Sequence, residues 1–158
     1  PMRDSITVHL APGWQELSAA DFAPAFADVA GDAVRYIAAI PPERVGYAAN
    51  LVVVRVPVGP DQDPEQELME SARAMVESIP GMRLIEDVPT DFDLYMSRVR
   101  AGVYILDEDA LTVLQVAWLD METQGTSLWT ATFTCRTRDF STFLAQYYEM
   151  AQSLEVTE

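Results

Sequence analysis

Residues 94–136 read LYMSRVRAGVYILDEDALTVLQVAWLDMETQGTSLWTATFTCR, and this stretch decides the fold class. Three strand-like runs follow one another in it with turn-sized gaps: Leu94 to Leu106, Ala110 to Met121 and Ser127 to Arg136. The charged residues Asp107 to Asp109 separate the first two runs, and Gly125 precedes the third, as is typical of turns. The stretch therefore predicts three consecutive antiparallel strands.

The two faces of each run differ in polarity. In the first run, one face carries Tyr95, Val99, Ala101, Val103 and Ile105, and the other carries Met96, Arg98, Arg100 and Tyr104. This period of two predicts a strand with the first set in the core. The second run is apolar on both faces, which is typical of a covered central strand. In the third run, the Thr-rich face is expected to be wet or to press against something polar.

Other parts of the chain predict four more strands: Ser5 to Leu10, Val34 to Ile40, Asn50 to Val58 and Met82 to Val88. Pro12, Gly13 and Trp14 are expected to end the first of these. The Ala-rich segment from Ser18 to Val34 is expected to be a short amphipathic segment.

Two helices are predicted, the first of them from the capping and terminating residues at its two ends. Asp63 is a suitable N-cap, Pro64 suits the first helical position, and Pro80 with Gly81 ends the first helix. The second helix is expected to start near Asp139 or Ser141. Its apolar face would run to Leu154, and the tail beyond Leu154 is expected to fray.

The order of elements predicts an α+β fold, in which an antiparallel sheet is flanked by helices. Strand and helix do not alternate along the chain, which argues against a doubly wound parallel fold. A length of 158 residues suits a single globular domain over residues 1–158. Such a domain buries roughly 70% of its unfolded surface without disulfides or metals.

Charge and composition exclude several classes of protein. The net charge is −15, and all 10 basic residues are arginines, so duplex nucleic acid is not an expected partner. The acidic field suits a basic protein or peptide. No apolar run of about 18 residues is present to span a membrane. One cysteine, Cys135, excludes an intrachain disulfide.

Four short motifs follow one another in a characteristic order: Pro12-Gly13-Trp14, Asn50-Leu51-Val52-Val53, Ile79-Pro80-Gly81 and Gly102-Val103-Tyr104. In this order the chain resembles the LpqN/LpqT family of actinobacteria, within the Mog1/PsbP-like superfamily. The resemblance implies an antiparallel sheet of about six strands in an α/β/α sandwich. It also implies a non-catalytic binding or accessory protein, and it offers no catalytic motif to transfer.

The start of the chain leaves two locations open. Pro1 is interpreted as a cloning remnant ahead of Met2, the native start methionine, which predicts a cytoplasmic protein. LpqN-type proteins are typically exported lipoproteins, whereas this sequence shows no lipobox cysteine and no signal segment. If such a segment preceded Met2, the protein would be envelope-associated.

No pattern of catalytic or metal-binding residues stands out, and no cofactor motif is present. His9 is the only histidine, and its sequence neighbours supply no second ligand or catalytic partner. Cys135 alternates with apolar residues, as a buried thiol does. The acidic stretch from Asp61 to Glu67 has Gln66 where a calcium loop needs glycine. We therefore expect a protein that is not an enzyme and has no cofactor or metal.

Three arginines lie inside predicted strands, where charged residues are normally avoided. Arg98 and Arg100 share a strand face with Tyr104, and Arg55 lies in another strand. One interpretation is a solvated face on which the arginines pair with acidic neighbours. The alternative is a shallow polar groove, formed by Arg55, Arg98, Arg100 and Tyr104, for an anionic ligand or a partner's acidic segment.

Two functions from different classes follow. The first is a protein-interaction or accessory module, either monomeric or homodimeric, with an exposed apolar patch. The second is a carrier of a small apolar or amphipathic ligand, held between sheet and helices. The carrier predicts a cavity lined by Met75, Trp118, Trp129 and Phe143. Aromatic residues and methionines at such spacings are more often core than pocket, so the first function is favoured.

Overall fold

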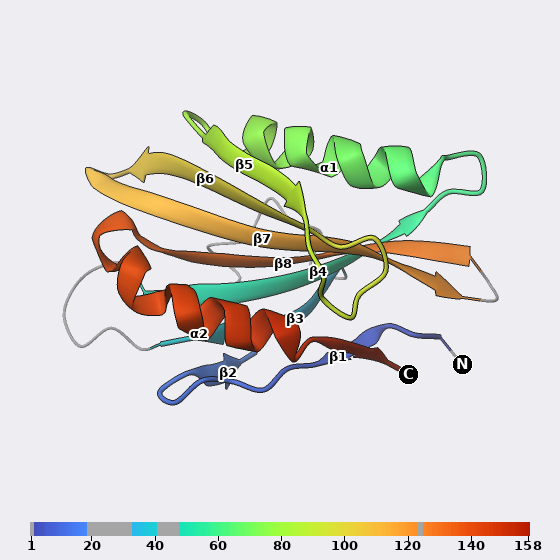
Figure 1. Cartoon of the computed structure of the whole chain (residues 1–158), viewed down its shortest axis with the longest axis horizontal. Coiled ribbons are helices and arrows are strands. Elements are labelled where there is room, and N and C mark those ends of the chain that lie inside the picture. Colours follow the sequence, from blue (N-terminus) through green and yellow to red (C-terminus); the bar gives the residue numbers. More distant parts are fainter. Residues whose placement is uncertain (1, 19–32, 41–47, 123–124) are drawn as a thin grey trace.

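In the described part of the chain, the architecture is an antiparallel sheet with one helix on each face (Figure 1). The computed structural model describes residues 2–18, 33–40, 48–122 and 125–158. Its strands and helices are β1 (Ser5–Thr7), β2 (Gln15–Leu17), β3 (Val34–Ala39), β4 (Asn50–Val58), α1 (Pro64–Ser78), β5 (Arg83–Pro89), β6 (Arg98–Leu106), β7 (Asp109–Glu122), β8 (Gly125–Arg136), α2 (Phe140–Gln152) and β9 (Glu155–Thr157). A short 3-10 helix, Thr137–Asp139, leads into α2.

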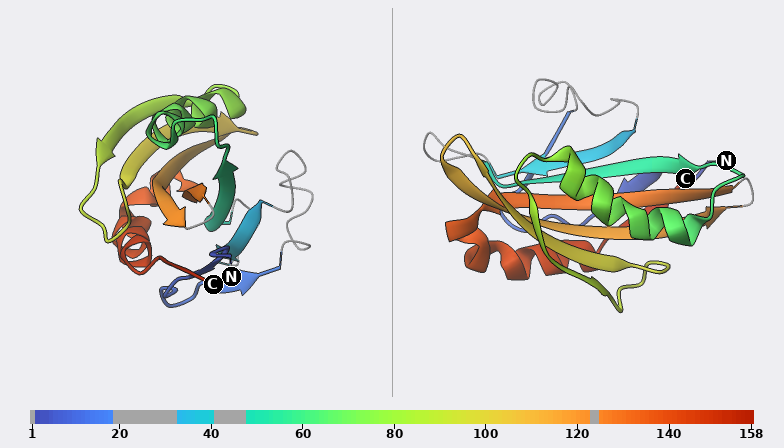
Figure 2. Two further views of the ribbon diagram at one scale, coloured as in Figure 1. Left: turned by 90° about the vertical axis from the view of Figure 1, so that its right-hand side faces the viewer. Right: turned by 90° about the horizontal axis from the view of Figure 1, so that it is seen from above.

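The main sheet has seven strands in the order β2-β3-β4-β8-β7-β6-β5, and every neighbouring pair is antiparallel. The three strands predicted within residues 94–136 are β6, β7 and β8, and they are adjacent in this sheet. Figure 2 shows that the sheet is curved. A separate two-stranded ribbon, β1 with β9, brings the two ends of the described chain together.

The expected α+β fold is confirmed, with one more strand in the sheet than the resemblance implied. The additional strand is β2. Gly13, at a φ of 89°, and a hydrogen bond from the Trp14 N–H to the Ala11 carbonyl oxygen reverse the chain after the first strand. Pro12, Gly13 and Trp14 therefore form a turn into a new edge strand, β2, and do not only end the first strand.

Three predictions about the ends of elements were wrong. Met96 has a φ of 55°, which no strand residue adopts, so β6 begins at Arg98 and not at Leu94. The tail beyond Leu154 does not fray, because β9 pairs with β1. The predicted first strand, Ser5 to Leu10, ends at Thr7, because Thr7 pairs with Glu155, the first residue of β9. The segment predicted over Ser18 to Val34 falls largely on residues outside the described part.

The turn between β6 and β7 explains the three acidic residues there. Leu106 pairs with Asp109, which leaves Asp107 and Glu108 as a two-residue hairpin loop. Both have positive φ, 48° and 74°, as a hairpin turn that matches strand twist requires. The prediction of a hairpin at this point is confirmed.

Helix α1 starts as its sequence predicts. Pro64 occupies the first turn, and the Asp63 carboxylate accepts a hydrogen bond of 3.1 Å from the Glu65 N–H. Leu68, Ala72 and Met75 are buried against the sheet. Met69, the neighbour of Leu68, lies outside this buried stripe and is 50% exposed.

The main core lies between the sheet and α2. Its largest members are Trp118, Trp129, Phe133 and Tyr147, and each of them is at most 1% exposed. Helix α1 covers the opposite face with smaller clusters around Leu68 and Met75. Among the described residues, no helix is both long enough and apolar enough to cross a membrane.

Candidate functional site

The four residues of the predicted polar groove lie on two different faces of the sheet. Arg98, Arg100 and Tyr104 alternate along β6 on the face that α1 covers. Arg55 lies on β4 directly opposite Trp129 of β8, on the face that α2 covers. The sheet therefore separates Arg55 from the other three residues, and only those three share a surface.

Arg100 is fully buried between the sheet and α1, with an exposed fraction of 0%. Its Nη2 donates to the Leu68 carbonyl oxygen at 2.5 Å, and its Nη1 donates to Ser71 Oγ at 2.6 Å and Gln115 Oε1 at 3.1 Å. Burial lowers the pKa of Arg100, and the attraction of Asp87 opposes that shift. Both terminal nitrogens of the Arg100 guanidinium, Nη1 and Nη2, thus donate hydrogen bonds within the protein.

A row of polar side chains continues from Arg100 across the sheet. Asp87 Oδ1 lies 2.9 Å from Arg98 Nε and 3.4 Å from Arg100 Nε. On the other side, Gln115 Nε2 donates to Thr132 Oγ1 at 3.0 Å. The Thr face of β8 therefore meets a polar partner at this position. The row ties four strands and α1 together through side chains.

Arg55 is 8% exposed and lies opposite Trp129. Within the part of the chain that the structure describes, its Nε is buried without a hydrogen-bond partner. Tyr104 packs beside Met75, Met82 and Val113. Arg55, on the other face of the sheet, does not extend the Arg100 row.

The four residues of the predicted ligand cavity also divide between the two faces. Trp118 and Trp129 stack with ring centroids 6.0 Å apart on the α2 face, and Phe143 stacks on Tyr147 at 6.1 Å. Met75 lies on the α1 face with Met82 and Val113. The sheet therefore stands between Met75 and the two tryptophans, and the four do not line one cavity.

The other candidate residues are placed separately. His9 is exposed, and its backbone N–H donates to Ser153 Oγ at 2.8 Å. Cys135 is 1% exposed, and burial raises the pKa of its thiol. The described residues hold no group of three or more His, Cys, Asp or Glu side chains that could bind a metal ion.

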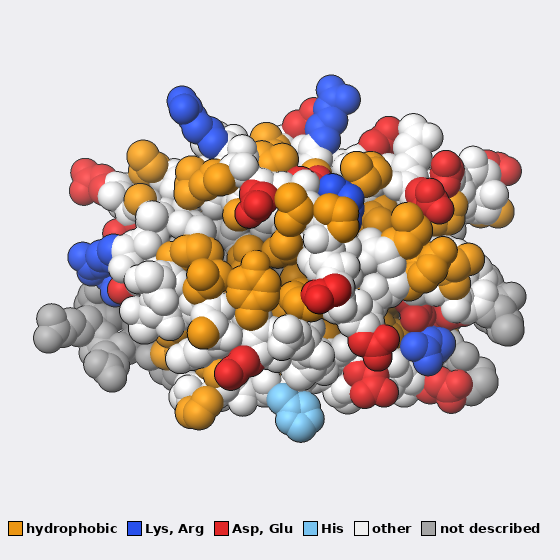
Figure 3. Space-filling model, in the orientation of Figure 1, with side chains coloured by type: hydrophobic (Ala, Val, Ile, Leu, Met, Phe, Trp, Pro, Cys, Tyr) orange, Lys and Arg blue, Asp and Glu red, His pale blue; other side chains and the backbone are white. Residues whose placement is uncertain are grey.

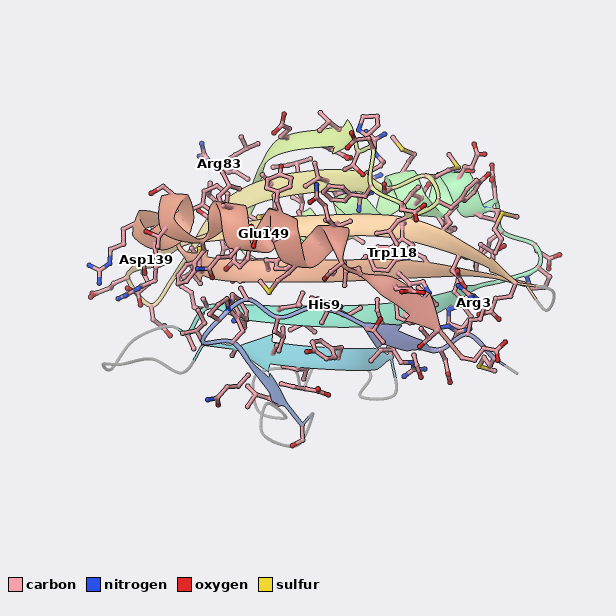
Figure 4. All side chains as sticks on the ribbon, turned by 60° about the horizontal axis from the view of Figure 1, so that its bottom comes forward. Arg3, His9, Arg83, Trp118, Asp139 and Glu149 are labelled. Atoms are coloured by element: carbon pink, nitrogen blue, oxygen red, sulfur yellow. The ribbon has the colours of Figure 1, made fainter. Side chains whose placement is uncertain are left out.

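A feature that sequence reasoning missed is a surface groove of about 780 Å³. It is lined by Arg3, His9 and residues 93–95, 118–121 and 152–156, and it is called the Trp118 groove below. These segments come from both ends of the chain, from β7 and from the connection between β5 and β6. Figure 4 labels three of the lining residues, Arg3, His9 and Trp118.

The groove has a buried floor and exposed apolar walls. Trp118, Leu154 and Val156 are at most 6% exposed, whereas Tyr95 is 55% exposed and Met121 is 63% exposed. Figure 3 shows the face that carries His9, where hydrophobic side chains are exposed between acidic ones. Large apolar side chains at the rim of a concave surface are typical of an interaction site.

The wall that carries Tyr95 is held by its own hydrogen bonds. The Leu119 N–H donates to the Tyr95 carbonyl oxygen at 3.0 Å, and the Thr90 N–H donates to the Ser97 carbonyl oxygen at 3.0 Å. The Thr90 and Ser97 hydroxyls also contact each other. Met96, with its positive φ, is therefore held in the left-handed region by a connection bonded at both ends.

An arginine from the start of the chain occupies one end of the groove. Arg3 Nε lies 3.1 Å from Asp120 Oδ2, and Arg3 Nη2 donates to Asp120 Oδ1 and to the Val156 carbonyl oxygen, both at 3.2 Å. The hydrogen bond and charge of Asp120 raise the pKa of Arg3. This contact joins the β1–β9 ribbon to β7 beside the groove.

Comparison by sequence finds no relative, since neither a protein-family model nor a curated protein matches the chain. Comparison by structure does. LpqN of Mycobacterium tuberculosis, a protein involved in cell envelope biogenesis, is similar with a TM-score of 0.76 and 13% identity over 97% of this chain and 83% of LpqN. The fold is Mog1/PsbP-like.

Two further structures share the Mog1/PsbP-like fold. Cyanobacterial PsbP of Synechocystis sp. PCC 6803 has a TM-score of 0.63 and 13% identity over 98% of this chain and 94% of that chain. The Ran-binding protein Mog1p of Saccharomyces cerevisiae has a TM-score of 0.58 and 9% identity over 96% of this chain and 90% of Mog1p. At these identities the likeness shows the fold alone. The fold that the sequence resemblance implied is confirmed.

Proposed function

We propose that this chain is a non-catalytic binding module that docks a protein partner in the Trp118 groove. The observation that carries the proposal is the contrast between Tyr95 and Met121, which are more than half exposed, and the buried Trp118 beneath them. Tyr, Trp and Met are enriched in the centres of protein interfaces, where they supply most of the binding energy.

The rigidity of the groove supports the same proposal. Its Tyr95 wall is bonded to β7 through Leu119, and its opposite wall is held by the pairing of β9 with β1. A preformed wall reduces the conformational entropy that binding must overcome. The fold agrees with such a role, since the similar Mog1p is a Ran-binding protein.

Site-specific photo-crosslinking in the host tests the proposal. A crosslinker at Tyr95 is expected to capture a discrete partner, whereas one at Ile105, which is 72% exposed and outside the groove, is not. The partner, once purified, should bind Met121→Ser at least about fivefold more weakly than wild type and Ile105→Ser within about twofold. Equal capture at both positions, or equal affinity of both variants, would contradict docking in the groove.

Native mass spectrometry of protein purified from its host separates docking from ligand carriage. A stoichiometric small molecule retained by the chain would favour the carrier. A complex with the crosslinked partner, or a bare chain that forms that complex on mixing, supports docking. Fractionation of the same cells distinguishes the cytoplasmic location from the envelope location.

A further inference from the structure

The Trp118 groove carries an unbalanced set of charges. Three carboxylates line it, Asp93, Asp120 and Glu155, against one arginine, Arg3. Arg3 pairs with Asp120 and also donates its backbone N–H to Glu122 Oε1 at 3.1 Å. Asp93 and Glu155 are exposed and make no ion pair or side-chain hydrogen bond within the described part of the chain. Two acidic groups in the groove are therefore available to a ligand.

The floor of the groove is apolar. Trp118 is 1% exposed and lines the groove together with the buried residues Leu154 and Val156. The groove therefore offers apolar surface beside Asp93 and Glu155, which suits an occupant that carries an apolar side chain next to its charge.

Arg3 shows what kind of side chain suits the groove. Its guanidinium binds Asp120 through two donors and the Val156 carbonyl oxygen through one of them. A second basic side chain in the groove would form ion pairs with Asp93 and Glu155. The aliphatic part of that side chain would pack against Tyr95 and Met121, which are exposed on the same surface. A tyrosine ring also attracts a cation that approaches its face.

We propose that the occupant of the Trp118 groove is a basic segment of a partner protein, with an arginine or lysine next to an apolar residue. This inference rests on the proposed docking function and adds the chemistry of the partner. The basic side chain pairs with Asp93 and Glu155, and the apolar neighbour covers Met121. The net charge of −15 attracts such a segment to the molecule, and the groove selects it.

A peptide titration tests the inference on the full chain. The probe is a short peptide in which arginine alternates with leucine, and binding is followed by calorimetry and by tryptophan fluorescence. The comparison peptide has citrulline in place of each arginine, which preserves shape and removes charge. The arginine peptide is expected to bind at least about tenfold more tightly than the citrulline peptide.

A matched pair of variants separates the groove from the bulk charge of the molecule. Asp93→Asn with Glu155→Gln removes two charges from the groove, and Asp61→Asn with Glu65→Gln removes two exposed charges at the start of α1. The groove variant should lose about tenfold in affinity for the arginine peptide, and the α1 variant no more than about twofold. Equal losses, or equal binding of the citrulline peptide, would overturn the inference.

The same experiments separate this inference from the docking function on which it rests. If the Tyr95 crosslinker captures a partner through a segment without basic residues, docking stands and the basic segment is wrong. If the crosslinker captures no partner while the arginine peptide binds with the expected loss in the groove variant, the charge selectivity stands and protein docking in the host is wrong.

Discussion

Arg100 on β6 donates to the main-chain carbonyl oxygen of Leu68 in α1, with an Nη2–O distance of 2.5 Å. Ser71, one turn further along the helix, accepts from the same guanidinium and donates to the same carbonyl oxygen. A charged side chain in the sheet thus recognises the backbone of a helix. The position of α1 depends on this polar contact as well as on its apolar stripe.

Replacing Arg100 with Met should lower the free energy of unfolding by about 3 kcal/mol, because it removes the buried donor of Ser71 Oγ, Gln115 Oε1 and the Leu68 carbonyl oxygen. Urea denaturation followed by circular dichroism measures the change. Arg73→Met is the matched control, since the Arg73 side chain is 81% exposed and its pair with Glu77 is worth at most about 0.5 kcal/mol. Equal effects of the two substitutions would show that the buried contacts contribute nothing to stability.

The burial of Arg100 shows where sequence reasoning stops. Alternation along residues 98–104 correctly predicts which side chains share a face, because the period of a strand is local. Whether a second layer covers that face depends on where α1 packs, and α1 is about 30 residues earlier in the chain. The charges on β6 were therefore recognised as unusual, but their partners in the helix were not.

The Trp118 groove was missed for a related reason. Its walls come from residues 93–95, 118–121 and 152–156 together with Arg3, so no short window of sequence contains it. The three-residue strands β2 and β9 are likewise too short to show a period. In contrast, β7 and β8 are long and patterned, and both were predicted to within two residues at each end.

Removing the cap of α1 should cost about 1 kcal/mol of stability. Asp63→Ala deletes the carboxylate that accepts from the Glu65 N–H, whereas Asp63→Ser keeps an oxygen at that position. Thermal or urea unfolding of the three proteins measures the effect. The serine variant should retain most of the wild-type stability, and an alanine variant as stable as wild type would exclude a role for the cap.

Tyr36 should make the protein sensitive to alkaline conditions. Burial, with repulsion from Glu16, raises the pKa of Tyr36 from 10.0 to about 12. Because the folded state disfavours the phenolate, the stabilising effect of the neutral ring is complete below about pH 10 and is lost as the pH rises toward about 12. Urea midpoints at about pH 9 and about pH 11 should therefore fall more in wild type than in Tyr36→Phe. Equal losses in the two proteins would contradict this assignment.

Replacing Arg3 with Met should loosen the β1–β9 ribbon without unfolding the sheet. The ribbon has only three residue pairs, and Arg3 links it to β7 through Asp120 and the Val156 carbonyl oxygen. Hydrogen exchange should quicken at Ser5–Thr7 and Glu155–Thr157 and stay unchanged in α1, because the Arg3 contacts support the ribbon in addition to the core packing of Ile6 and Val156. The Arg3 side chain is 41% exposed, so high salt should weaken the wild-type contact and reduce the difference between the two proteins. Arg73→Met is again the control, and unchanged exchange in the ribbon of the Arg3 variant would show that strand pairing and core packing hold it without Arg3.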